Sequence, residues 1–151
     1  MNVSLSDWLK NAWLIEHETS PQEIADLLSI IDRDLNDCRS PGLSSDWKMA
    51  IAYNAVLHVA IVGLAAEGYR VARESHHFRA IQSLEFTLRC SSRLIAQIDA
   101  FRKKRNISDY ERAGSVSDRE AEEVGKLATE IQSQLLDWLR NAHPELIPSQ
   151  A

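Results

Sequence analysis

The sequence predicts an all-α protein, a bundle of four to six helices with up-down topology. Apolar residues recur at helical spacing, serine-led motifs precede the helical segments, and no run of alternating apolar and polar residues indicates a strand. The 151 residues fit one domain spanning 1–151. The helices are expected near residues 4–16, 21–38, 46–67, 76–89, 92–105 and 118–142.

Two serine-led motifs mark helix starts. Ser20 is followed by Pro21 at the first helical position and by Glu23 at the third, and Ser117 is followed by Glu120 at the same spacing. In such a capping box the serine side chain accepts a hydrogen bond from a backbone N–H that has no partner within the helix. The motifs therefore place helix starts near residues 21 and 118.

The central helix, expected over 46–67, is apolar nearly all round. Ser44 or Ser45 can cap its start, and Gly68 suits the left-handed conformation that often follows a helix end. Met49–Ala66 holds 18 residues without a charged side chain, the lower limit for a membrane span. The segment is rich in alanine and contains polar residues, so we expect a buried core helix and no membrane association. Its apolar surface exceeds what one side of a bundle needs, which predicts a homodimer.

The first residues and the cysteines bear on location and metal binding. Charged residues stand close to Trp8 and Trp13, which is not the layout of a signal peptide, so a cytoplasmic protein is expected. Cys38 and Cys90 are too few and too far apart for a zinc site. Because the sequence also has no glycine-rich phosphate loop, we expect neither a metal nor a cofactor.

Charge is unevenly distributed along the chain. Residues 70–112 hold ten Arg or Lys against five Asp or Glu, while the whole chain has a net charge of −5. Four consecutive cations, Arg102, Lys103, Lys104 and Arg105, form the centre of this basic stretch. Such asymmetry predicts a face for phosphate or an acidic partner, although two differently charged solvated surfaces would give the same pattern.

Arg105 continues an apolar stripe of its helix. It lies eleven residues after Leu94, and eleven helical residues return to within about 20° of the same direction. An inward-facing guanidinium must find acceptors. Asn106 and Asp109 favour leaving the helix, and a turn there would bring Tyr110 towards Arg105. Alternatively, Arg105 caps helix carbonyls or pairs with Asp109, and Tyr110 is an aromatic at the edge of the core.

With these features the sequence resembles the HEPN superfamily, and it is most similar to the small stand-alone members. The resemblance covers most of the chain and is weakest before residue 47. It rests on a basic run followed by Arg105-Asn106, three residues and then Tyr110. The segments that support it are Tyr53-Asn54-Ala55, Ala65-Ala66-Glu67-Gly68-Tyr69, His76-His77, Trp138-Leu139 and His143-Pro144-Glu145-Leu146.

The resemblance implies a HEPN core over 46–143, preceded by N-terminal helices over 1–45. Many HEPN proteins are metal-independent ribonucleases, with a motif of Arg, a polar residue and, after a few more, His. Arg105 and Asn106 match this motif, whereas Tyr110 stands in place of the histidine. A histidine exchanges protons near its pKa of about 6.5, whereas a tyrosine does so only near its pKa of about 10. Two interpretations are therefore open. The chain is either a degenerate endoribonuclease with Arg105 and Tyr110 as catalytic residues or a HEPN member that does not cleave RNA.

Other residues extend the candidate RNA- or partner-binding set. Asn54 and His58 lie four apart on one helical face and either extend a polar pocket or are internally bonded polar groups in the bundle core. Arg102, Lys103 and Lys104 supply cations for the same surface. His76-His77 offers adjacent residues that do not share a face, so it is not expected to bind metal.

Three functions remain open at this level. The first is an RNA-directed HEPN protein with Arg105, Asn106 and Tyr110 at a dimer cleft. The second is a non-catalytic, antitoxin-like partner of a nucleotidyltransferase in a toxin–antitoxin system, in which Tyr110 is an acceptor for modification. The third is a structural helical dimer without chemistry.

Overall fold

The computed structural model describes residues 4–73, 76–110 and 116–147, with 106–110 by their backbone alone. Helices dominate, and the all-α expectation is confirmed apart from one two-stranded sheet. The chain order of the elements is α1 Leu5–Lys10, β1 Leu14–Glu16, α2 Pro21–Cys38, α3 Ser45–Ala66, β2 Tyr69–Val71, α4 His76–Ser83, α5 Ser92–Tyr110, α6 Asp118–Ala142 and the 3₁₀ turn η1 Pro144–Leu146.

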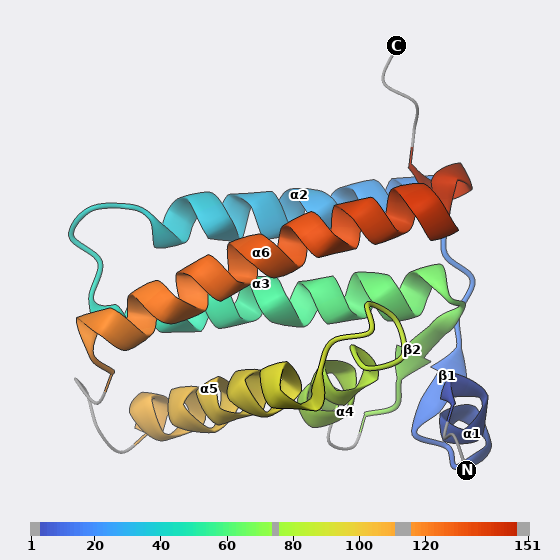
Figure 1. The fold of residues 1–151 in the computed structure, drawn as a ribbon, viewed down its shortest axis with the longest axis horizontal. Coiled ribbons are helices and arrows are strands. Elements are labelled where there is room, and N and C mark those ends of the chain that lie inside the picture. The colour runs from blue at the N-terminus through green and yellow to red at the C-terminus, as the bar shows by residue number, and fades with distance from the viewer. Residues whose placement is uncertain (1–3, 74–75, 111–115, 148–151) are drawn as a thin grey trace.

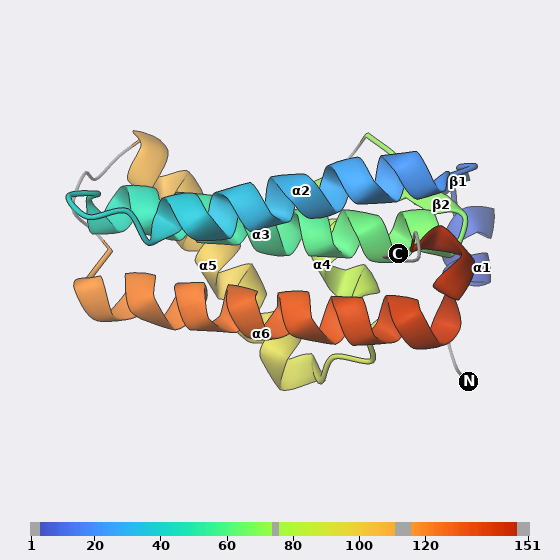
Figure 2. The same ribbon diagram turned by 90° about the horizontal axis from the view of Figure 1, so that it is seen from above.

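The long helices α2, α3, α5 and α6 run in alternating directions, which is the up-down arrangement (Figure 1). Helix α3 lies in the centre. Helices α2 and α6 cover one side of it, and α4 and α5 cover the other (Figures 1 and 2). The basic part of α5 is thereby placed against α3 rather than on an outlying arm.

Helix α3 is central because its apolar residues point in every direction. Its buried residues run from Met49 to Ala65 and include Tyr53 and Gly63. Within the described ranges it is the one helix long and apolar enough to cross a membrane, and 67% of its most apolar window is buried inside the protein. The homodimer prediction assumed apolar surface that one chain could not cover. Neighbouring helices cover most of it, so the dimer stays a prediction without that argument.

The predicted caps are present in the structure. The Ser20 hydroxyl accepts a hydrogen bond from the Glu23 backbone N–H at 3.1 Å, although the Glu23 carboxylate binds Thr19 and His17 instead of closing a capping box. Ser117 and Glu120 form the complete reciprocal box. Gly68 follows α3 with a φ of 93°, which favours glycine.

The N-terminal segment differs from the single helix expected over 4–16. Helix α1 ends at Lys10, Ala12 adopts a φ of 63°, and β1 then pairs antiparallel with β2. Ile15 faces Arg70 in this short ladder. The prediction of no strand was therefore wrong. A three-residue strand has too few residues to show alternation, and its partner lies more than fifty residues away in sequence.

Two further boundaries differ from expectation. Helix α4 ends at Ser83 rather than near residue 89, and the chain then turns, with Arg89 at a φ of 59°. Helix α5 continues to Tyr110, so the helix end expected at Arg105 was wrong. Asn106 and Asp109 only weakly oppose helix, and tertiary context commonly overrides such preferences.

Candidate anion-binding site

Three of the four cations in the basic run of α5 are already paired. Arg102 Nε lies 2.7 Å from Asp99 Oδ1, and Lys103 Nζ lies 3.5 Å from the other carboxylate oxygen of Asp99. Lys104 Nζ lies 2.5 Å from Glu120 Oε2 and so ties α5 to α6. The two Asp99 pairs lie within α5, whereas the Lys104–Glu120 pair joins two helices. All three contacts reduce what these cations can offer a ligand.

Arg105 has a different environment. Its side chain is half-buried, and its guanidinium carbon lies 5.6 Å from the centre of the Tyr53 ring on α3. Its Nε is buried and has no hydrogen-bond partner in the part of the chain that the structure describes. The apolar stripe correctly predicts an inward-facing Arg105. The acceptors that such a group requires are not supplied by the described residues.

Tyr53 presents a second buried polar atom beside Arg105. The residue is 1% exposed, and its Oη also lacks a partner among the described residues. Burial raises the pKa of Tyr53 to about 12. Arg102 and Arg105 act in the opposite direction, and Asp99 also raises the pKa. The phenol is therefore protonated at neutral pH and can donate a hydrogen bond.

His77 reaches the same place from α4. Its ring centre lies 6.3 Å from that of Tyr53, and its side chain is half-buried. Burial lowers the pKa of His77, and its electrostatic interactions with His76, Arg105, Arg102 and His58 lower it further. The imidazole is thus neutral at pH 7 and can accept a proton. We call Tyr53, His77, Arg102 and Arg105 together the Arg105 cluster.

The sequence did not assign a role to His77. Adjacent histidines on one helix argue against a metal site, and within the described ranges no group of three or more His, Cys, Asp or Glu could hold a metal ion. What makes His77 notable is its approach to α3 and α5. The histidine pair appears among the segments that support the HEPN resemblance, but its spacing gives no sign of this approach.

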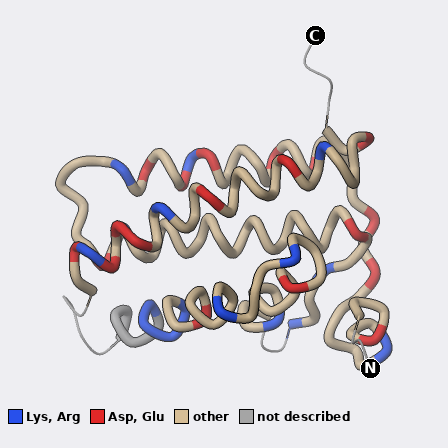
Figure 3. Tube along the Cα trace, viewed as in Figure 1, with Lys and Arg blue, Asp and Glu red and all other residues tan. Residues whose placement is uncertain are grey.

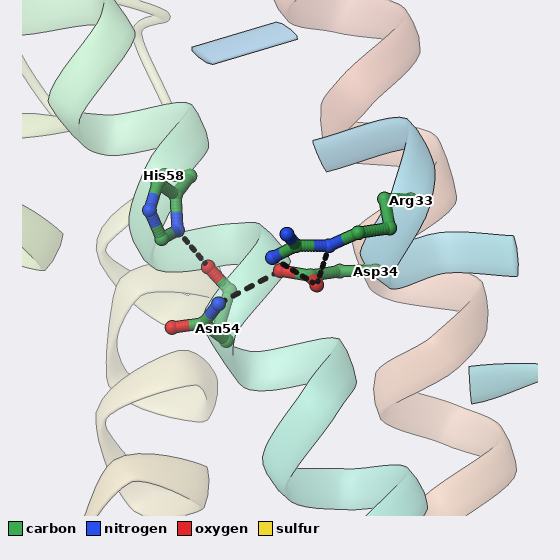
Figure 4. A network of polar contacts seen from close by, with 4 residues as sticks. All are labelled: Arg33, Asp34, Asn54 and His58. Atoms are coloured by element: carbon green, nitrogen blue, oxygen red, sulfur yellow. Dashed lines mark hydrogen bonds and ion pairs between the residues drawn. The ribbon is translucent and has the colours of Figure 1, made fainter. Parts of the chain in front are cut away.

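Asn54 and His58 take part in a network that joins α2 to α3 (Figure 4). Asn54 Nδ2 donates to Asp34 Oδ2 at 2.7 Å, and His58 Nδ1 lies 2.9 Å from the Asn54 carbonyl oxygen. Arg33 pairs with the other oxygen of the buried Asp34 at 3.3 Å. Of the two alternatives left open by the sequence, these contacts match internally bonded polar groups. His58 still contributes to the potential at His77.

Asn106 and Tyr110 belong to the continuous helix α5, so the turn expected between them and Arg105 is not formed. Residues five apart on a helix point about 140° from one another. The side chains of Asn106 and Tyr110 lie outside those that the structure describes. Their proposed approach to Arg105 stays a prediction, now without the turn that motivated it.

The charge distribution distinguishes α5 from its neighbours (Figure 3). Lys and Arg gather on the described part of α5, while Asp and Glu are frequent on α2 and α6. A groove between α2, α3 and α6 is lined by Arg39, Lys48 and Lys126 but also by Glu122 and Glu130. Its mixed charge does not select an anion, so the Arg105 cluster is the stronger candidate.

Comparison with known proteins adds no assignment. No protein-family model matches the chain, and no curated protein or solved structure matches it either. The HEPN resemblance consequently rests on the sequence motif.

Proposed function

We propose that this chain is a cytoplasmic, HEPN-like protein that binds RNA through phosphate contacts at the Arg105 cluster. The observation that carries the proposal is Arg105 itself. It is a half-buried cation whose Nε has no acceptor in the described part of the chain, beside a protonated phenol and a neutral imidazole. A guanidinium offers planar, bidentate hydrogen bonding that suits phosphate oxygens.

The associated catalytic proposal is a degenerate, metal-independent endoribonuclease in which Arg105 clamps the phosphate and Tyr110 stands where HEPN nucleases have histidine. A tyrosine is mostly protonated at pH 7 and is a poor base. Binding is therefore expected to exceed cleavage. The cations Arg102, Lys103 and Lys104 and the polar Asn106 would contribute to the surface along which the RNA backbone lies.

A direct test measures binding and cleavage of labelled single-stranded RNA in the presence of a metal chelator. Arg105→Ala should weaken binding by about tenfold or more, equivalent to a loss of about 1.4 kcal/mol. Arg119→Ala removes a cation whose side chain is 90% exposed at the start of α6 and serves as the matched control. Equal binding by both variants would reject RNA contact at Arg105. Cleavage that disappears only in Arg105→Ala would assign nuclease activity.

A partner function is favoured by a separate observation. Trp47 is 64% exposed although most of α3 is buried. Exposed tryptophans are frequent anchors of protein–protein contacts. The second proposal is therefore a homodimer or an antitoxin-like complex with a nucleotidyltransferase, in which Trp47 lies at the interface.

Light scattering separates these arrangements. The measurement uses protein at roughly tens of micromolar. A wild-type dimer together with a monomeric Trp47→Ser variant would support the homodimer. A wild-type monomer would count against it. A nucleotidyltransferase encoded by a neighbouring gene and retained by the wild type but not by Trp47→Ser would instead support the complex.

A further inference from the structure

We propose that the Arg105 cluster recognises a terminal phosphate of RNA, a phosphomonoester, in preference to the phosphodiesters within the strand. This inference rests on the proposed RNA binding and specifies which phosphate is bound. It follows from the number of uncompensated positive charges that the cluster can present and from the hydrogen-bond donors beside them.

The two arginines of the cluster differ in how far they are neutralised. The charge of Arg102 is offset by Asp99 at 2.7 Å, and Arg102 also lies over the Phe78 ring. Arg105 has no carboxylate partner among the described side chains, and its guanidinium lies over the Tyr53 ring. Among the described side chains, the cluster thus presents one fixed positive charge without a carboxylate partner, before any of its groups changes protonation.

His77 would supply a second positive charge by taking up a proton when the ligand binds. The titratable and charged groups around Tyr53 and His77 come from three helices: His58 on α3, His76 on α4, and Asp99, Arg102 and Arg105 on α5. Burial, and to a lesser extent the neighbouring groups including Arg105 and Arg102, lower the pKa of His77, so it is neutral in the free protein. A dianion placed beside Arg105 would reverse that field and favour proton uptake by His77. The resulting imidazolium and guanidinium would match the charge of a phosphomonoester, which is about −1.5 to −2 at pH 7.

The unpartnered donors point to the same ligand. Arg105 Nε can only donate, and the Tyr53 hydroxyl is protonated at neutral pH. A terminal phosphate presents three strong acceptor oxygens, roughly one for each of Arg105, Tyr53 and His77. A phosphodiester carries a single negative charge and fewer free oxygens, so Arg105 alone matches its charge and proton uptake by His77 would not be favoured. Tyr53 would thus have two roles, since its hydroxyl donates to the phosphate and its buried ring lies against the guanidinium of Arg105.

The test compares one short RNA in three forms: with a 5′-phosphate, with a 3′-phosphate and with hydroxyls at both ends. Binding of each form is measured by calorimetry with the full chain at about pH 6.5 and about pH 8, both above the second phosphate pKa of about 6. At least one phosphorylated form should bind with a Kd about tenfold lower than that of the hydroxyl form. The preference should be larger at the lower pH, with measurable proton uptake on binding.

Two variants connect the preference to the cluster. His77→Gln should abolish the pH dependence and most of the preference, while Arg119→Ala should leave both unchanged. Arg105→Lys keeps the charge but loses the planar fork, so it should weaken the phosphorylated form more than the hydroxyl form. Thermal melts of each variant show whether it is folded.

The outcomes separate this inference from the proposed function. Equal, Arg105-dependent binding of all three RNAs would overturn terminal-phosphate recognition and leave RNA binding in place. Adenosine monophosphate, tested alone, distinguishes an RNA end from a free nucleotide. If it binds as tightly as the phosphorylated RNA, the ligand is a nucleotide and the RNA-end assignment is overturned. Failure of every ligand to bind would overturn both proposals.

Discussion

The guanidinium of Arg105 and the ring of Tyr53 lie against each other, with the guanidinium carbon 5.6 Å from the ring centre. A cation over an aromatic face is attracted by the ring quadrupole. Tyr53 Oη and Arg105 Nε are both buried, and neither has a hydrogen-bond partner among the described residues. The fold therefore retains two polar groups at a cost to stability, which is characteristic of functional sites.

Removing the buried hydroxyl should stabilise the free protein. Tyr53→Phe keeps the ring under Arg105 and eliminates an unpaired polar group, so we expect the free energy of unfolding to rise by about 1 kcal/mol. Urea denaturation measures this change. Tyr69→Phe is the control, since Tyr69 is only partly buried and its substitution should change stability by less than about 0.5 kcal/mol. A destabilised Tyr53→Phe would mean that the hydroxyl has a bonding partner.

His77 should make the fold sensitive to mild acid. Its pKa is lower in the folded protein than in the unfolded chain, where it is about 6.5, so the unfolded chain takes up a proton first. The contribution of the neutral His77 to the free energy of unfolding is then fully present above about pH 7 and falls as the pH is lowered through about 6.5. His77→Gln should flatten this part of the curve, measured by denaturation between about pH 5 and 8. The lowered pKa values of Glu23 and Glu120 act below 4.5, outside this window. An unchanged acid slope in His77→Gln would contradict the prediction.

The link between α2 and α3 should depend on Asn54. In Asn54→Ala the buried Asp34 carboxylate loses its 2.7 Å donor, and among the described residues it keeps the largely exposed Arg33. We expect a loss of about 1–3 kcal/mol in the free energy of unfolding. Asn141→Ala, at an exposed position near the end of α6, should have little effect. A double-mutant cycle with Asp34→Asn would show strong coupling if the two side chains act as a pair.

Two helical glycines should respond in opposite directions to alanine. A Cβ at Gly63 would lie 3.1 Å from Thr87 Oγ1 and 3.2 Å from Thr87 Cβ, and Thr87 is itself buried. Gly63→Ala should therefore destabilise the protein by about 1 kcal/mol or more. A Cβ at Gly125 meets nothing within 4 Å, so Gly125→Ala should stabilise α6 by about 0.5–1 kcal/mol. Thermal melts of the pair provide the comparison, and equal shifts would show that Thr87 moves aside.

The sequence by itself determined the features that depend on nearby residues. Helices α2 and α6 begin where Ser20 and Ser117 predict, because a cap acts on backbone groups within one turn. The central position of α3 follows from its composition, since a helix that is apolar all round must be covered. The inward direction of Arg105 follows from its spacing after Leu94 on the same helix.

Only the tertiary structure decided which distant residues meet. Strand β1 exists because Ile15 pairs with Arg70, and no local pattern in three residues could reveal that partner. Lys104 binds Glu120 on the next long helix. Because Arg102 and Lys103 pair with Asp99, the run of four cations leaves mainly Arg105 for a ligand. His77, Tyr53 and Arg105 come from three helices, and their approach depends on how those helices pack. Periodicity fixes the direction of a side chain around its own helix, whereas the contacts and the pKa of the group depend on the neighbours that packing brings to it.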